Sequence, residues 1–159
     1  MTVAEILKKE FPESFISEHH DYGDETVFIQ KSNIVTVMRF LKYDARTSFE
    51  QLLDLCGVDY QGETPRFEVV YHLYSLSKKK RLRIRVKVDE TDLKINTIIP
   101  VWEIADWFER EAWDMYGIYF EGHPNLKRLL TWEGFVGHPL RKDYPVNKRQ
   151  PIPEPLDIV

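Results

Sequence analysis

The chain has 159 residues, 43% of them hydrophobic and 30% charged, with a formal net charge of −4 at pH 7. These proportions are typical of a globular protein and exclude a disordered or fibrous chain. No run of about 18 apolar residues could span a bilayer, and a single cysteine permits neither an internal disulfide nor a cysteine zinc site or iron–sulfur cradle.

The N-terminal residues predict a helix followed by a β-hairpin. Thr2 and Glu5 have the spacing of a capping box, and the apolar stripe that follows ends before Pro12. Charged side chains interrupt this stripe, unlike the uncharged core of a secretory signal, so we expect the chain to stay in the cytoplasm. Runs of β-forming residues at 15–18 and 26–30 flank a turn and predict an antiparallel hairpin.

Two further helices are predicted next. Ser32 is a candidate N-cap for a helix whose apolar residues recur at helical spacing between 34 and 41. A capping box at 48–51 predicts another helix that ends at Gly57. This helix would turn Cys56 toward the core, where we interpret it as a structural thiol, because a reactive thiol needs an accessible, electropositive setting.

The central part of the chain predicts a sheet and a long helix. Residues 67–75 and 81–88 alternate with period two and predict an antiparallel hairpin. A strand at about 94–99 follows, and then a strongly patterned helix at 101–116 that Gly117 stops. Hairpins mixed with helices predict an α+β fold, in which helices cover a mixed or antiparallel sheet.

The composition changes after residue 120. Six of the nine prolines lie in the last 36 residues, and proline interrupts both helices and central strands. We therefore expect an α+β globular domain at 1–120 and an extended proline-rich C-terminal arm at 121–159. Residues 125–150 carry six cations and two acids, and the arm holds more apolar residues than an ordinary linker. We infer that it becomes ordered against another protein.

The helix at 101–116 has an apolar face and a charged face. On a helical wheel, Arg110 stands one turn from both Asp106 and Asp114. Such carboxylates suggest acid–base catalysis, but we prefer an exposed ladder of ion pairs, because Arg110 neutralises the acids. Trp107 projects from the charged face and would suit either a partner interface or partial cover by the protein's own loops.

Other functions stay open from residue types alone. His123, His138 and Asp143 suggest a metal-binding or hydrolytic trio, although their spacing matches no ligand motif and Gly-His-Pro is a turn former. Seven cations within 78–87 form a basic sheet face that suits RNA, an acidic partner or solvent. No glycine-rich phosphate loop occurs, so the usual cradle for a dinucleotide or nucleoside triphosphate is missing. The residues alone indicate an α+β domain with a proline-rich arm, which is a subunit of a larger assembly.

The segment from Glu109 to Leu130 resembles the signature of the 30-kDa subunit of respiratory complex I, which is the C subunit of bacterial NADH-quinone oxidoreductase. A second block at 139–145 is similar to that family too, and weaker similarity extends upstream. The signature positions that match are Glu109, Arg110, Glu111, Asp114, Gly117, Phe120, Gly122, His123, Pro124, Leu126 and Arg128. Among these, we interpret Gly117 and Gly122 as requirements of the backbone.

This resemblance implies a subunit with no catalytic residues and no metal, flavin or iron–sulfur cluster of its own. FMN, the iron–sulfur clusters and quinone would lie in partner subunits of a proton-translocating complex that passes electrons from NADH to quinone. The subunit would embrace the 49-kDa quinone-site subunit in the peripheral arm, on the cytoplasmic side of the inner (plasma) membrane. It would contact neither nucleic acid nor, directly, the membrane. Related subunits occur in membrane-bound hydrogenases and in complexes with other donors, so the donor stays open.

We therefore expect the domain and its arm to act as a clamp on neighbouring subunits. Cations of the arm would dock on acidic surface, and its aromatic residues would be anchors. The candidate cations are Arg128, Arg141 and Lys142, the candidate anchors are Trp132, Phe135 and Tyr144, and Asp143 completes the second block.

Overall fold

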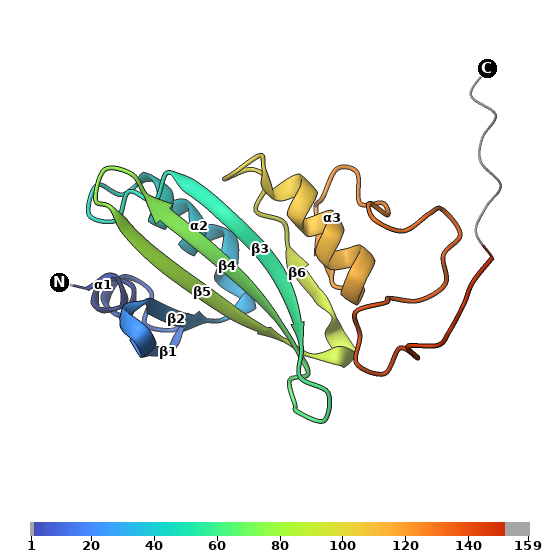
Figure 1. Ribbon diagram of the computed structural model, residues 1–159. Helices are drawn as coiled ribbons and strands as arrows, with labels where there is room; N and C mark the ends of the chain where they lie inside the picture. Colours follow the sequence, from blue (N-terminus) through green and yellow to red (C-terminus); the bar gives the residue numbers. More distant parts are fainter. Residues whose placement is uncertain (1, 152–159) are drawn as a thin grey trace, which may run out of the picture.

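The computed structural model describes residues 2–151. Within them, three α-helices accompany a five-stranded sheet, in the order β1-β2-β5-β4-β3, and a two-stranded sheet of β6 and β7. Figure 1 shows the long strands β3, β4 and β5 side by side, with α2 across the sheet and α3 along its β3 edge. This is an α+β fold with a mixed sheet, as the sequence predicts.

The N-terminal prediction is confirmed. α1 (Val3–Glu10) begins at a capping box in which Thr2 and Glu5 bond reciprocally. The strands β1 (Phe15–His19) and β2 (Glu25–Ile29) pair antiparallel.

The second helix is also present, with a different start. α2 spans Ile34–Tyr43, and its apolar residues at the predicted spacing are buried. The residue at its N-cap is Asn33, and Ser32 lies one position earlier, in the 3₁₀ turn Lys31–Asn33. The predicted cap was therefore wrong by one residue, while the helical periodicity identified the element.

The helix predicted at residues 48–57 is wrong. Ser48 has a left-handed backbone (φ 50°) that a helix N-cap does not adopt, and β3 (Gln51–Asp59) follows. A bulge between Leu52 and Asp54 interrupts the alternation of β3, so its apolar residues imitate helical spacing. Cys56 is consequently half-buried on the face opposite Leu55, and the prediction that it faces the core is wrong.

The central hairpin is confirmed and forms the middle of the sheet. β4 (Phe67–Ser75) pairs antiparallel with β3 on one side and with β5 (Lys80–Val88) on the other. β2 then adds to β5 in parallel, which makes the sheet mixed. The predicted strand near 94–99 is shorter: β6 (Lys94–Asn96) pairs in parallel with β7 (Tyr119–Glu121).

The last helix begins four residues later than predicted. α3 spans Ala105–Tyr116, and Gly117 ends it in the left-handed conformation (φ 80°). Ile104, which the periodicity assigned to the core face, precedes the helix and is 48% exposed.

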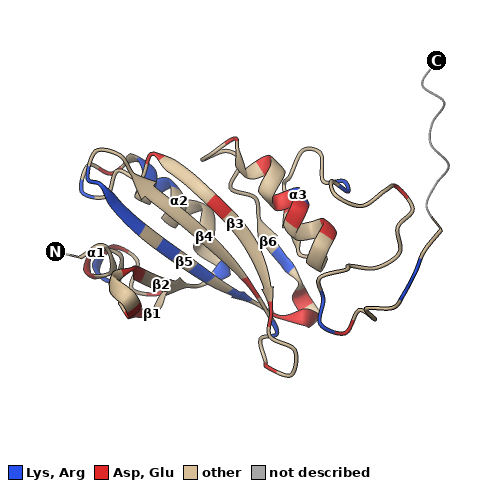
Figure 2. Ribbon diagram, in the orientation of Figure 1, with Lys and Arg blue, Asp and Glu red and all other residues tan. Residues whose placement is uncertain are grey.

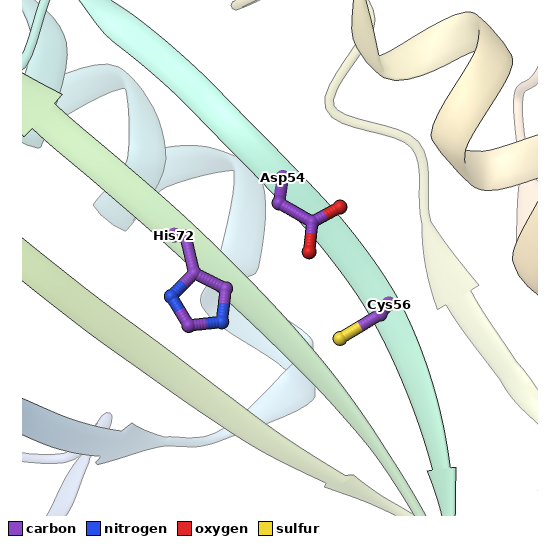
Figure 3. A group of neighbouring side chains, drawn as sticks. All are labelled: Asp54, Cys56 and His72. Carbon is purple, nitrogen blue, oxygen red and sulfur yellow. The ribbon is translucent and has the colours of Figure 1, made fainter.

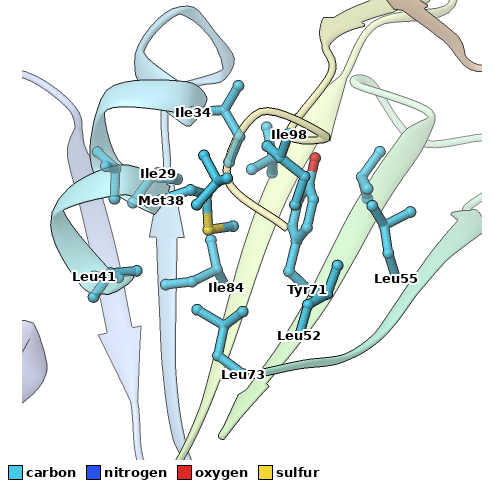
Figure 4. Packing of buried hydrophobic residues seen from close by; sticks show 14 of the residues in the cluster. Ile29, Ile34, Met38, Leu41, Leu52, Leu55, Tyr71, Leu73, Ile84 and Ile98 are labelled. Carbon is cyan, nitrogen blue, oxygen red and sulfur yellow. The ribbon is translucent and has the colours of Figure 1, made fainter. Parts of the chain in front are cut away.

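The core lies on one face of the sheet. Figure 4 shows Met38 and Leu41 of α2 against Ile84 and Leu73 of the sheet, with Tyr71 further along β4. Alternate residues of β5 point into this core, as predicted, and the residues between them line the opposite face. The two faces of the sheet therefore have different chemistry.

Residues 122–151 contain no helix or strand and run along α3 (Figure 1). The division into a domain at 1–120 and an arm at 121–159 stays a prediction, and residues 152–159 of that arm lie outside the described residues. None of the helices between residues 2 and 151 combines the length and hydrophobicity that crossing a membrane requires.

Candidate partner interface around helix α3

The carboxylate of Asp114 is the centre of the contact between α3 and the C-terminal segment. Its side chain is fully buried. One oxygen accepts hydrogen bonds, between 2.8 and 3.0 Å long, from the backbone N–H groups of Leu129, Leu130 and Thr131. The other oxygen accepts a bond from the guanidinium of Arg128 at 2.7 Å. A single acid thus fixes the backbone of a segment that has no secondary structure.

Hydrogen bonding keeps this acid ionised. Burial by itself raises the pKa of Asp114, but the hydrogen bonds from Thr131, Arg128 and Leu129 lower it more, and the pKa falls to about 2. Asp114 therefore carries a full negative charge at neutral pH. That charge is compensated by Arg128 and by the N–H dipoles that converge on it.

The C-terminal end of α3 is closed by residues more than twenty positions further along the chain. A helix leaves four carbonyl groups unpaired at this end. The carbonyl of Trp113 accepts a hydrogen bond from the N–H of Gly117. His138 Nδ1 donates to the carbonyl of Asp114 at 3.0 Å. The N–H of Leu140 donates to the carbonyl of Met115 at 3.1 Å, and Nε of Arg141 donates to that of Tyr116 at 2.6 Å. The C-terminal segment thus completes the helix.

Gly117 is needed for conformation and for space. Its φ of 80° suits glycine, and a Cβ atom here would lie 2.6 Å from Nε2 of His138 and 2.7 Å from Nη2 of Arg141. Gly122 also has a positive φ, of 82°. Both glycines therefore serve the backbone, as the sequence predicts.

The exposed ion-pair ladder predicted on α3 is wrong. Arg110 is only 8% exposed, and its guanidinium donates to the carbonyls of Lys127 and Arg128, both at 3.3 Å. Asp106 instead contacts His123, whose Nε2 lies 3.1 Å from its carboxylate. The C-terminal segment covers this face of the helix, which a helical wheel of the isolated segment does not reveal.

A second anchor lies at the ends of β3 and β4. Arg66 donates to both oxygens of the buried Asp59, at 2.8 and 2.9 Å, and lies 2.9 Å from the carboxylate of Asp143. Asp59 also accepts from the N–H of Lys142 at 2.8 Å. The bonds from Arg66 lower the pKa of Asp59. These contacts tie residues 142–143 to the sheet.

Two of the three cations predicted to dock on a partner are used within the chain. Arg128 bonds Asp114 and the carbonyl of Gly137, and Arg141 bonds the end of α3. Their guanidinium groups thus have partners within the chain, and their docking role stays a prediction. Lys142 is exposed, so its docking role stays a prediction.

The predicted aromatic anchors contact one another. Trp132 and Phe135 meet edge to face with ring centres 5.0 Å apart, and Phe135 stacks on Tyr144 at 6.0 Å. Arg128 lies 5.4 Å from the centre of the Phe135 ring. All three rings are half-buried, which leaves part of each ring accessible, and their anchoring role stays a prediction.

Glu109 is a buried acid with a different environment. Its oxygens accept from the hydroxyl of Thr97 at 2.6 Å and from the N–H of Ile98 at 2.8 Å. Burial raises its pKa to about 7, although both hydrogen bonds act against this. Glu109 therefore joins α3 to the chain before it and titrates near neutrality.

The suggested histidine trio does not form. His123 lies against Asp106, His138 bonds the carbonyl of Asp114, and Asp143 pairs with Arg66. Each group has its own structural partner, so these residues do not converge on a metal or a substrate.

Three of the cations on the basic strand β5 pair with neighbouring acids. Figure 2 marks the Lys and Arg positions of this strand in blue. Arg85 pairs with the buried Glu68, Arg83 lies 3.8 Å from Asp24, and Lys87 lies 3.6 Å from Glu63. These pairs argue against the phosphate-binding face that the run of cations suggested.

Exposed apolar side chains concentrate on the α3 side of the molecule. Among the described residues, twelve large hydrophobic side chains are exposed, and seven of these belong to residues from position 104 onward in the sequence. They are Ile104, Trp107, Tyr119, Leu130, Val136, Leu140 and Val146. Such a concentration is typical of a surface that another protein covers.

Comparison with known proteins agrees with the signature around α3. Residues 27–150 match the model of the family described as "Respiratory-chain NADH dehydrogenase, 30 Kd subunit". The chain belongs to this family. The matched residues therefore include the strands β3, β4 and β5, helix α3 and the segment that Asp114 holds.

Named relatives of this 30-kDa subunit family span more residues than the chain. The C subunit of the NADH-quinone oxidoreductase of Caulobacter vibrioides is 51% identical over 125 residues, which are 79% of this chain and 63% of that protein. The C subunit of the same enzyme from Citrifermentans bemidjiense is 46% identical over 140 residues, 88% of this chain and 86% of that protein. The chain thus covers less than two thirds of the Caulobacter relative.

Solved structures have the same fold as this chain. The trypsin-resistant fragment (1-134) of Nqo5 superposes with a TM-score of 0.68 at 30% identity, over 79% of this chain and all of that one. A chain of the archaeal membrane-bound sulfane sulfur reductase superposes with a TM-score of 0.74 at 20% identity, over 91% of this chain and 85% of that one. The second likeness shows the fold alone.

The residues of the two family blocks differ in burial. Several shape the structure: Glu109, Arg110, Asp114 and Phe120 are buried, and Leu126 packs on the core. Others are exposed, among them Glu111, Pro124 and Lys142. The exposed residues, the accessible parts of the three rings and the exposed apolar side chains are the candidates for contact with another protein.

No sequence pattern marks four of the residues that build the site. They are Asp59, Arg66, Thr97 and Thr131. Each pairs with a group at least seven residues away, so local spacing does not reveal it. The one signal in the sequence is the excess of apolar residues in the C-terminal segment, which indicates that the segment packs on something.

Proposed function

We propose that this chain is the 30-kDa subunit of an NADH-quinone oxidoreductase and that it acts as a structural clamp. It binds the 49-kDa subunit through α3 and the C-terminal segment, on the cytoplasmic side of the membrane. Membership of the 30-kDa family supports the assignment, and the relatives' name supplies the reaction. In this role the subunit keeps its neighbours in place while electrons pass from NADH to quinone.

One observation carries the clamp. Contacts with the acids Asp114 and Asp59 and with Arg66 fix the path of the C-terminal segment, and that segment displays exposed apolar side chains. Leu130, Val136 and Leu140 are 62%, 65% and 49% exposed, although the N–H groups of Leu130 and Leu140 bond to α3. A pre-ordered apolar surface loses little entropy on binding, so it suits a permanent contact between subunits.

The proposal includes no redox group in this chain. Flavin and iron–sulfur clusters need a phosphate cradle or several thiolates, and the sequence offers one cysteine. FMN, the clusters and quinone are therefore assigned to the partner subunits. Electron transfer depends on this subunit only through the positions of its neighbours.

Charge substitution on the apolar surface tests the clamp. We expect Leu130→Asp, Val136→Asp and Leu140→Asp together to reduce co-purification of partner subunits from native membranes about tenfold or more, because each buried anchor contributes more than about 1 kcal/mol. The melting temperature of the isolated chain stays unchanged, because the three side chains are already exposed.

A matched control is available on the rest of the molecule. Ile16→Asp, Tyr22→Asp and Leu76→Asp change exposed apolar side chains that precede α3 in the sequence and do not belong to the seven residues of the α3 side. This triple variant keeps normal co-purification. Equal recovery of partners with both triple variants would show that the complex is not held through this surface.

A further inference from the structure

Three ligand-type side chains converge on the outer face of the sheet, away from α2. Asp54 and Cys56 are two residues apart on β3 and therefore share a face, and His72 on β4 is the register partner of Asp54. One ligand atom from each lies within 4.8 Å of the other two. Figure 3 shows the thiol and the imidazole turned into the same space between the strands.

These donor atoms are not used elsewhere in the part of the chain that the structure describes. All three side chains are half-buried, yet between residues 2 and 151 none of them forms a hydrogen bond or an ion pair. The second group of ligand-type side chains, Glu18, His20 and Glu25, differs in this respect. Glu25 there accepts the N–H of Ala4, and His20 lies 3.7 Å from Glu18.

The local charge favours a cation at the thiol. Asp54, Glu111 and Glu68 place negative charge around the Cys56 thiol. Positive charge nearby comes from Arg83. The guanidinium of Arg83 is itself engaged by Thr26 at 3.2 Å and by Asp24 at 3.8 Å.

Open space adjoins two of the three donors. Asp54 and His72 line a cleft of about 440 Å³, together with Asp24 and Arg83. A metal held by three protein ligands needs such a space for a water molecule. Tetrahedral zinc with bonds of about 2.0–2.3 Å places its ligand atoms roughly 3.5 Å apart, so small side-chain rotations close the observed arrangement.

We propose that Asp54, Cys56 and His72 bind one zinc-class divalent cation, with water as the fourth ligand. Binding replaces the S–H bond of Cys56 by a metal–sulfur bond and releases the thiol proton to solvent. The ion ties β3 to β4 beside the bulge at Leu52, where the ladder of hydrogen bonds is interrupted. Zn²⁺ has no redox chemistry, so this proposal is compatible with a chain that has no redox group. It differs from the expectation that the chain binds no metal.

Cobalt provides a direct test in the full-length chain without a histidine tag. Cys56 is the only cysteine, so any thiolate-to-cobalt charge-transfer band in the near ultraviolet must come from it. Titration with Co²⁺ is expected to produce this band at one ion per chain, and Zn²⁺ is expected to abolish it by displacement. Zn²⁺ also slows alkylation of Cys56 by iodoacetamide.

Variants distinguish a three-ligand site from metal binding by the thiol of Cys56 alone. Cys56→Ser abolishes the band. His72→Asn and Asp54→Asn each weaken Co²⁺ and Zn²⁺ binding about tenfold or more, because the loss of a ligand reduces affinity at least as much as the loss of a group that hydrogen-bonds to a ligand. His20→Asn, from the other group, leaves binding unchanged. Melting curves without metal confirm that each variant is folded. Absence of the band, or a band with unchanged affinity in His72→Asn, would overturn the proposal.

Discussion

At Asp114, one side chain fixes the backbone of residues 129–131, a segment that lies well beyond the end of α3 in the sequence. The carboxylate is buried, which is unfavourable for a charge, yet three backbone N–H groups and Arg128 surround it. The pKa of about 2 shows that these bonds outweigh burial. Removal of the charge leaves those donors without an acceptor, and unpaired buried donors cost more than the bond itself contributes.

Replacement of Asp114 by asparagine is expected to lower the free energy of unfolding by about 2–4 kcal/mol. The amide offers one acceptor oxygen where the carboxylate offers two, and Arg128 loses its counter-charge. Urea denaturation of the two chains measures the difference. Glu111→Gln, on the exposed face of the same helix, serves as the control and stays within about 0.5 kcal/mol. A loss no larger than that of the control would refute the role given to Asp114.

Glu109 makes stability depend on pH in the neutral range. Its pKa is about 7 in the folded chain and 4.5 ordinarily. Between these two pH values, the folded state therefore keeps a proton on Glu109 that the unfolded state has released. The stability that this proton contributes is present below pH 4.5 and is lost as the pH rises through 7. From pH 4 to pH 8, the native chain should lose about 3 kcal/mol relative to Glu109→Gln. Parallel pH profiles of unfolding for the two chains would contradict this.

At the scale of elements, sequence patterns identified those whose periodicity was regular. The capping box of α1, the spacing of Met38 and Leu41 in α2, and the alternation of β5 each survive in the structure. β3 was misassigned because its bulge shifts the alternation after Leu52. Pairing of β2 with β5 in parallel was not predictable, because it joins residues nearly sixty positions apart without a local signal.

The candidate site was predictable in some of its residues but not in its contacts. The signature located Asp114, Gly117 and Arg128, and the glycine conformations followed from residue type. The burial of Arg110 could not be predicted in this way. Periodicity describes an isolated helix, whereas the segment that covers Arg110 comes from residues 127–128. Long-range cover of this kind is a tertiary property.

The approach of α3 to β3 depends on Gly57. A Cβ atom at this residue would lie 2.6 Å from a ring carbon of Tyr116, so the strand and the helix meet across a missing side chain. Gly57→Ala is expected to destabilise the chain by about 1–3 kcal/mol through overpacking.

A double-mutant cycle with Tyr116→Ala isolates this contact, because the ring that would clash is then absent. In that background Gly57→Ala should cost less than about 0.5 kcal/mol, measured by urea denaturation. Equal costs in both backgrounds would show that Gly57 is needed for another reason.

At the scale of the whole molecule, the two faces of the sheet have separate roles. The inner face packs on α2 and forms the core, and α3 extends the β3 edge with the C-terminal segment attached (Figure 1). The outer face carries paired charges and the three donor groups around Cys56. Metal binding is measured on the isolated chain and the clamp by co-purification of partner subunits, so the two proposals can fail independently.

Truncation distinguishes a segment that is part of the domain from one that depends on a partner. Deletion of residues 125–159 removes the donors to Asp114, the three donors to the carbonyls of residues 114–116, and the bond between Asp143 and Arg66. Deletion of residues 145–159 keeps these contacts and, among the described residues, removes the bonds of Gln150 to Val136 and Tyr144.

We therefore expect the longer deletion to lower the free energy of unfolding of the isolated chain by about 3 kcal/mol or more, and the shorter one by about 1 kcal/mol. The reason is that the longer deletion exposes the end of α3 and leaves several polar groups without partners, whereas the shorter one removes contacts that are already accessible to water. Urea denaturation of the three chains measures both values. If the longer deletion were as stable as the full chain, the segment would be an independent arm, and its order would have to come from the neighbouring subunit.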